Sequence, residues 1–313
     1  MILAELKRIL WYQKGIVIVL AVLLFDFYWF CDKNSSFIEN EQFVTLSQVY
    51  ERYEGPLDED KLKLIEADYK TCSKEGYEGL AFNSILWFAK NQLEKSSEPY
   101  LVYERGWDAI AYDFSANEPL IIIGLVLAVI AFASDAGNKV KNIVQTSVNG
   151  RRQMILSRIG VYSGIMLCFV LVQGILEFVY ASTMIGTRCL DAPVQSFMLN
   201  CTMDITLIQA YALVLFLRYI GVLLAGVIVC LVASVTKNMY MSIIAGALVF
   251  FEGYFFSYIY EWEYLLPEHL IASYMFFEGA NLVKTLCITL VTILILLGVI
   301  CHIENESSRR KLV

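Results

Sequence analysis

The chain has 313 residues, of which 58% are hydrophobic and 18% are charged, and its mean hydropathy is +0.58. Soluble domains are roughly half apolar, so this composition excludes a soluble globular protein. The formal net charge is -7, but acidic and basic residues gather in different segments, and the pattern does not indicate nucleic-acid binding.

Six stretches are long and apolar enough to cross a bilayer. A spanning helix needs about 20 residues and satisfies its own backbone hydrogen bonds where no water is present. We therefore expect an all-α polytopic membrane protein with six transmembrane helices. The expected spans are residues 15–31, 119–134, 159–184, 207–234, 240–260 and 282–302.

The first 14 residues have the pattern of an amphipathic helix. Its polar face carries Glu5, Lys7 and Arg8, and a helix of this kind lies in the membrane interface with its apolar face toward the lipid. A cytoplasmic extension of the first span is the alternative that the pattern leaves open. The apolar face consists of Ile2, Leu3, Leu6, Ile9 and Leu10.

Residues 32–118 are polar and acidic, and they are long enough to form a small extracellular domain between the first and second spans. Residues 58–72 open with acidic side chains, which favour a helix N-terminus, and they place Leu62, Ile65 and Tyr69 on one face. Residues 79–93 are a second candidate helix. We therefore expect this domain to be helical.

Residues 135–158, between the second and third spans, contain a short amphipathic pattern followed by a turn at Asn149 and Gly150. A short helix here suits docking onto a cytoplasmic partner, while a solvated linker explains the same pattern equally well. The apolar face is made of Val140, Ile143, Val144 and Val148, and the basic pair Arg151 and Arg152 follows the turn.

Basic residues predict the orientation of the spans. Residues 1–14, 135–158, 235–239 and 303–313 share one side of the membrane, and together they hold twelve Lys or Arg against four Asp or Glu. The loop after the fifth span carries four glutamates and no basic residue before Lys284. The excess of Lys and Arg in cytoplasmic loops then places both ends of the chain in the cytoplasm of a cell-membrane protein.

Four charged residues fall inside the predicted spans, where a charge is costly and faces the protein interior or water. Glu177 and Arg218 lie roughly 10 and 16 Å from the outer ends of their spans, at 1.5 Å per residue, so they are able to pair. A polar lining for a substrate path and a structural ion pair both remain open as interpretations. The four residues are Asp26, Glu177, Arg218 and Glu252.

Cys189 and Cys201 share the outer loop between the third and fourth spans, where a disulfide persists in an oxidising environment. We expect a bond between them, and two reduced thiols are the alternative.

The sequence contains none of the patterns that mark common catalytic sites. No G-x-x-x-x-G-K-[ST] phosphate loop occurs, so the chain does not bind ATP by that device. His269 and His302, the two histidines, are expected on opposite sides of the membrane, which leaves no histidine metal cluster and no histidine-based triad. We expect no catalytic, cofactor-binding or metal site on this chain.

Three segments carry a likeness to a known family: MILAELKRILW at 1–11, YLVYERGWDAI at 100–110 and FASDAGNKVKNIVQTSVNGRRQMILSRI at 132–159. They resemble the permease subunits of type-2 ABC exporters, in particular a Gram-positive subgroup with an external insert after the first span. The family carries an acidic residue, a short helix and a Thr/Ser-x-x-x-Arg-like approach to the third span in the last of these segments. Those places are occupied here by Asp135, Thr146, Ser147, Arg151 and Arg152.

The resemblance implies a permease subunit that moves an amphipathic substrate, such as a peptide, out of a bacterial cell. It also implies two cytoplasmic ATPase subunits, which hold the ATP and magnesium, and a second permease chain, identical or related. ATP-driven closure would reach the bundle through residues 1–14 and 138–148. The alternative is a membrane sensor or immunity protein that captures a peptide through its external domain without transport.

Overall fold

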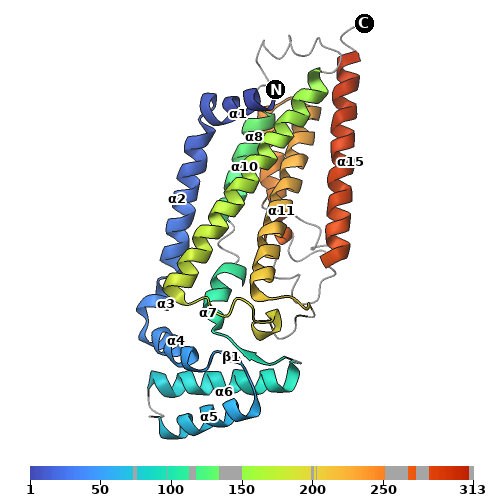
Figure 1. Cartoon of the computed structure of the whole chain (residues 1–313). Helices are drawn as coiled ribbons and strands as arrows, with labels where there is room; N and C mark the ends of the chain where they lie inside the picture. Colours follow the sequence, from blue (N-terminus) through green and yellow to red (C-terminus); the bar gives the residue numbers. More distant parts are fainter. Residues whose placement is uncertain are drawn as a thin grey trace.

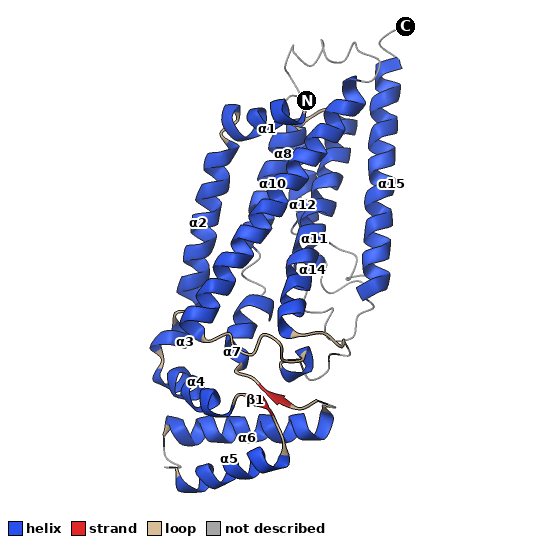
Figure 2. Ribbon diagram, viewed as in Figure 1, coloured by secondary structure: helices blue, strands red, loops and turns tan. Residues whose placement is uncertain are grey.

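The structure is a computed structural model, and it describes residues 1–72, 76–96, 98–112, 118–133, 150–198, 201, 203–250, 267–272 and 282–309. These residues are almost entirely helical, with one short two-stranded sheet (Figure 2). A bundle of long helices carries a smaller helical subdomain at one end. Helix α1 and the end of α15 lie at the opposite end, which we call the terminal end (Figure 1).

The bundle contains the described parts of the apolar segments that were expected to cross the membrane; residues 134 and 251–260 of the expected spans lie outside the described residues. Four helical segments in the described residues are long and apolar enough to do so: Gly15–Glu39, Arg152–Ile185, Leu207–Thr236 and Leu282–Glu306. Two shorter apolar helices, Pro119–Phe132 and Met239–Val249, lie among them. The helices are α2 (Gly15–Asn34), α8 (Glu118–Phe132), α10 (Gly150–Tyr180), α11 (Leu207–Thr236), α12 (Met239–Phe250) and α15 (Leu282–Arg309).

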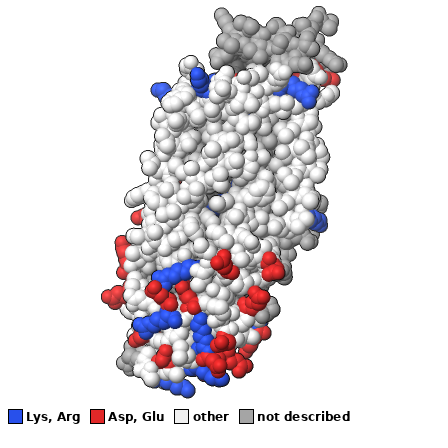
Figure 3. All heavy atoms as spheres, viewed as in Figure 1, with Lys and Arg blue, Asp and Glu red and all other residues white. Residues whose placement is uncertain are grey.

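The surface of the bundle supports insertion into a membrane. Large apolar side chains are exposed along α2 and α15, including Leu24 and Phe25 on the first and Leu294 and Ile295 on the second. On the face shown in Figure 3, a broad central band is almost free of charged side chains, and charges of both signs gather over the subdomain. The helical membrane class expected from the composition is therefore confirmed.

Helix α11 is the central element, and it packs against α8, α10, α12, α14 (Pro267–Ala272) and α15. Thr206 and Gln209 form a capping box at its start, which satisfies backbone groups that the first turn leaves free. Gly226 on this helix leaves room for the ring of Tyr162, whose hydroxyl donates to the Val222 carbonyl at 3.1 Å. The most buried of the four long apolar helices thus packs closely against α10 because Gly226 has no side chain.

The N-terminal segment turns sharply away from the first long helix. Helix α1 (Ile2–Lys7) continues as the π-helical turn η1 (Arg8–Tyr12), and Lys14 adopts a left-handed conformation with φ of 57°. Gly15 follows, and a Cβ there would lie 2.5 Å from the Ile9 carbonyl oxygen. A straight extension of the first span is therefore not found; α1 lies across the terminal end of the bundle (Figure 1).

The subdomain is helical, as expected. Asp58 caps α5 through a 2.7 Å bond from the Lys61 amide, which explains the acidic start of that segment. Gly55 and Pro56 pair with Leu101 and Tyr100 in the antiparallel sheet. The elements are α3 (Ser36–Glu39), α4 (Glu41–Tyr53), β1 (Gly55–Pro56), α5 (Glu59–Thr71), α6 (Tyr77–Lys95), β2 (Tyr100–Leu101) and α7 (Glu104–Trp107).

Two helices extend beyond the expected spans. Helix α10 begins at Gly150, ahead of the span expected from residue 159, so Arg151, Arg152 and Arg158 lie in a helix. Helix α2 continues to Asn34, three residues beyond the expected span end at residue 31. Residues 134–149 and 251–266 lie outside the described residues.

Candidate functional site

The strongest candidate for a site is a buried polar cluster inside the apolar bundle. It consists of Asp26 on α2, Gln173 and Glu177 on α10, and Arg218 on α11, and we call it the polar cluster. All four residues are at most 2% exposed. Gln173 and Glu177 are four residues apart, so the helical repeat places them on the same face of α10.

The charges of Glu177 and Arg218 meet directly. Arg218 Nη1 lies 3.0 Å from Glu177 Oε2, and both side chains are 1% exposed. Gln173 Nε2 donates to the other carboxylate oxygen at 2.9 Å, and Arg218 Nη2 donates to the Ile110 carbonyl at 3.2 Å. The ion pair therefore links α10 and α11 and also holds η2 (Asp108–Tyr112), the turn that contains Ile110.

Asp26 brings a second carboxylate from α2 to the same place. It interacts electrostatically with Glu177 and Arg218, and its Oδ1 is buried without a hydrogen-bond partner. The three groups have a net charge of -1 when all are ionised, which follows from two carboxylates and one guanidinium. Buried charges of this kind either pair with each other or face a polar path.

Three of the four charged residues singled out in the sequence thus come together, and Glu252 lies outside the described residues. Gln173 and the Ile110 carbonyl were missed. The position of Gln173 one turn before Glu177 was a signal that sequence reasoning had available. The Ile110 carbonyl carried no signal, because a backbone acceptor has no identity in the sequence.

A second group of charges ties the N-terminal segment to the terminal end of the bundle. Arg8 Nε lies 2.6 Å from Glu5 Oε2, and Arg158 Nε lies 3.4 Å from the same oxygen. Arg8 Nη2 also donates to the carbonyl of Ala131, near the end of α8, at 3.0 Å. This terminal cluster joins the N-terminal segment, α8 and α10.

The residues expected to dock an ATPase are only partly described. Val140, Ile143, Val144 and Val148 lie outside the described residues. Arg151 and Arg152 lie in the first turn of α10, and the side chain of Arg152 is exposed. This turn and the end of α8 flank residues 134–149 in the chain, and the terminal cluster contacts both helices.

The expected disulfide is not formed, because Cys189 and Cys201 are free thiols. The Cys201 amide donates to the Met198 carbonyl at 2.9 Å, so Cys201 closes a local turn with Met198. The outer loop is closed instead by backbone hydrogen bonds, such as that from the Val194 amide to the Ile205 carbonyl at 2.9 Å. Burial raises the pKa of both thiols.

Within the described ranges, no group of three or more His, Cys, Asp or Glu side chains is arranged to hold a metal ion. No protein-family model matches the chain, and no curated protein matches it. The described residues offer two charged arrangements: a buried ion pair with an extra carboxylate, and a charged link at the terminal end.

Proposed function

We propose that the chain is the permease subunit of an ABC exporter, which moves an amphipathic substrate such as a peptide outward with ATP hydrolysed by a separate subunit. The observation that carries the proposal is the terminal cluster. Glu5 and Arg8 tie the N-terminal segment to α8 and α10, the two helices that flank the segment proposed to dock the ATPase. A pull on that segment would therefore move three elements together.

The proposed topology has six spans, formed by the four long apolar helices together with α8 and α12. The terminal end faces the cytoplasm, because Lys7, Lys14 and Arg152 are exposed there. The subdomain is then extracellular. A fluorescent protein fused to the C-terminus should be bright, and alkaline phosphatase inserted between residues 72 and 76 should be active; the reverse pattern would overturn this topology.

The partners in this proposal are two ATPase subunits carrying ATP and magnesium, a second permease chain, identical or related, and the bilayer of a bacterial cell. The polar cluster has a structural role in the observed state, because Glu177 and Arg218 are 1% exposed and paired with each other. A conformation that separates α10 from α11 would expose both charges to the substrate path. The ion pair between Glu177 and Arg218 would then stabilise the conformation in which α10 and α11 are in contact.

The structure also favours one alternative, a sensor or immunity protein that captures a peptide without transport. The subdomain exposes large apolar side chains on its outer helices: Trp87 is 65% exposed and Leu80 is 56% exposed on α6, and Leu64 on α5 is 55% exposed. Exposed apolar patches mark interaction surfaces. An exporter would use such a surface to collect its substrate before transport, whereas a sensor would bind the peptide there without transporting it.

Copurification of an ATPase tests the exporter proposal. The tagged chain, extracted from native membranes in mild detergent, should retain a protein with a phosphate-binding loop, identified by mass spectrometry. Val144→Asp with Val148→Asp should abolish this association, because two carboxylates would interrupt the apolar docking face. A matched pair, Val235→Asp with Met239→Asp, changes exposed residues around the connection between α11 and α12 and should retain the ATPase.

The outcomes separate the hypotheses. Wild-type protein that retains no such ATPase, yet binds a peptide through the subdomain, is a sensor. Association that survives the Val144 and Val148 substitutions places the docking surface elsewhere.

A further inference from the structure

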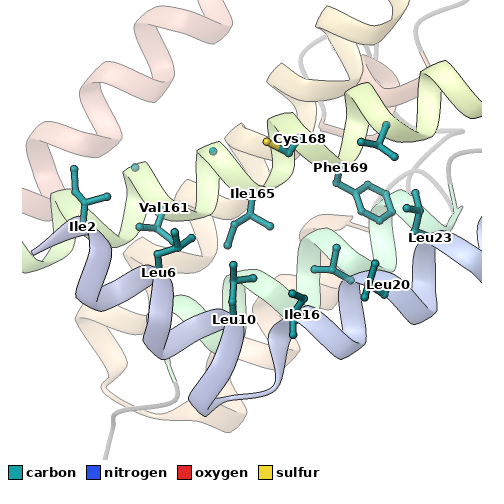
Figure 4. A pocket seen from close by; sticks show the side chains of 14 residues that line it. Ile2, Leu6, Leu10, Ile16, Leu20, Leu23, Val161, Ile165, Cys168 and Phe169 are labelled. Carbon is teal, nitrogen blue, oxygen red and sulfur yellow. The ribbon is translucent and has the colours of Figure 1, made fainter.

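A deep apolar groove lies between the N-terminal part of the chain and α10. Its volume is about 590 Å³, within the range of about 300–1,000 Å³ typical of ligand sites. Leu6 and Leu10 line it from the N-terminal segment, Ile16 and Leu20 from α2, and Ile165 and Phe169 from α10 (Figure 4). The residues that line it are all apolar, apart from the weakly polar thiol of Cys168.

The geometry of three helices produces this groove. Helices α2 and α10 are close at the subdomain end and diverge toward the terminal end, where α1 runs across the gap between them (Figure 1). The turn at Lys14 and Gly15 sets this arrangement, because Gly15 allows the close approach to the Ile9 carbonyl. The groove therefore has two walls and a cap, and it is open on the side.

The wall formed by α10 is hollow because side chains are missing there. Gly160 and Gly164 both line the groove, and a Cβ added at either position would meet no atom within 4 Å. Cys168 continues the same four-residue spacing. Small residues on a spanning helix normally admit a close partner, and here the partner's place is not taken by any described residue of this chain.

The shape and surroundings of the groove favour a lipid chain over a second helix. A helix with its side chains is about 10 Å wide, and one crossing the bilayer along this groove would collide with α1 at the terminal end. An acyl chain can enter from the open side. Lys7 and Lys14 are exposed in the same N-terminal segment that supplies the lining residues Leu6 and Leu10, while Glu5 is paired with Arg8 and Arg158.

We propose that this groove binds an acyl chain of an anionic phospholipid from the leaflet at the terminal end, with the phosphate beside Lys7 and Lys14. Basic side chains at a membrane surface attract anionic headgroups, and the apolar lining accepts the chain. The bound lipid would brace α1 against α2 and α10. This inference requires membrane insertion and does not depend on the exporter proposal.

Photocrosslinking tests the proposal. The full-length protein is reconstituted into nanodiscs that contain phosphatidylethanolamine and phosphatidylglycerol with a diazirine in the acyl chain, and the labelled peptides are mapped by mass spectrometry. Labelling should concentrate on residues 2–23 and 160–172. Gly164→Leu should lower it about tenfold, or ~1.4 kcal/mol, because the new side chain occupies the hollow. Gly160→Leu fills it from a second position.

Gly298→Leu is the matched control, because Gly298 is an exposed glycine on α15 with no atom within 4 Å of an added Cβ. It should leave labelling of the groove unchanged. Lys7→Gln with Lys14→Asn should lower labelling by phosphatidylglycerol more than labelling by a phosphatidylcholine probe.

Two results would overturn the proposal. One is wild-type labelling spread evenly over α10 and α15, which shows only the general lipid shell. The other is efficient crosslinking of Cys168 to Cys168 of a second chain in membranes, which places a protein in the groove.

Discussion

Removing one partner of the buried ion pair of Glu177 and Arg218 should cost almost as much stability as removing both partners. Removing one partner of a buried pair costs about 3–5 kcal/mol, because the other charge is left buried without compensation. We expect about 3 kcal/mol for Glu177→Gln, since the Asp26 carboxyl remains in the same buried cluster as the guanidinium. Arg218→Gln should cost about 4 kcal/mol, because the Ile110 carbonyl also loses its donor.

The double substitution leaves neither charge of the pair, so it should cost about 4 kcal/mol rather than the roughly 7 kcal/mol of simple addition, a coupling of about 3 kcal/mol. The free energy of unfolding is measured by titration with sodium dodecyl sulfate in mixed micelles, followed by tryptophan fluorescence. Trp107 is a suitable reporter, because it is buried with its ring centroid 6.5 Å from that of Phe178, the neighbour of Glu177.

The control is the pair of Lys63 and Asp60 on α5, which has the same 3.0 Å separation but side chains that are 68% and 89% exposed. Its double-mutant cycle should give less than about 0.5 kcal/mol, since water screens exposed charges. Losses at Glu177 and Arg218 that add within about 0.5 kcal/mol would show that the two residues do not stabilise each other. Unchanged stability with reduced export would instead place both charges on a wet substrate path.

Three further predictions follow from other contacts. Gly226→Ala should lower the free energy of unfolding by about 1–3 kcal/mol in the same titration, because its Cβ would lie 2.2 Å from the Tyr162 ring; an unchanged value contradicts this packing. Mass mapping after alkylation under non-reducing conditions should find Cys189 and Cys201 both modified, and a crosslinked peptide that joins the two would refute this. In the folded protein both thiols should react more slowly than free cysteine at neutral pH, because burial raises their pKa. Burial also raises the pKa of Glu54 above 4.5, so the folded state binds this proton more readily than the unfolded state, and the subdomain should lose stability as the pH rises from 4.5 through the raised pKa. Thermal melts of Glu54→Gln over that range should show a flatter pH dependence, and an equal slope would exclude this residue as the cause.

Local properties of the sequence were enough to predict the helical membrane class and several elements. The length of an apolar stretch and the internal hydrogen bonds of a helix decide what a bilayer accepts, and both are readable in order along the chain. The amphipathic first segment and the acid-capped helix from Glu59 were predicted for the same reason. Their signals come from neighbours within a few residues, such as Asp58 and the Lys61 amide.

Only the tertiary structure decided which polar groups meet. Glu177 and Arg218 are 41 residues apart in the chain, and their contact depends on how α10 and α11 are rotated about their axes. The same is true of the bond from Arg8 to the Ala131 carbonyl and of the two outer-loop cysteines, which remain free thiols. Helix rotation is set by packing over whole faces, such as Gly226 against Tyr162, and no short window of sequence contains that information.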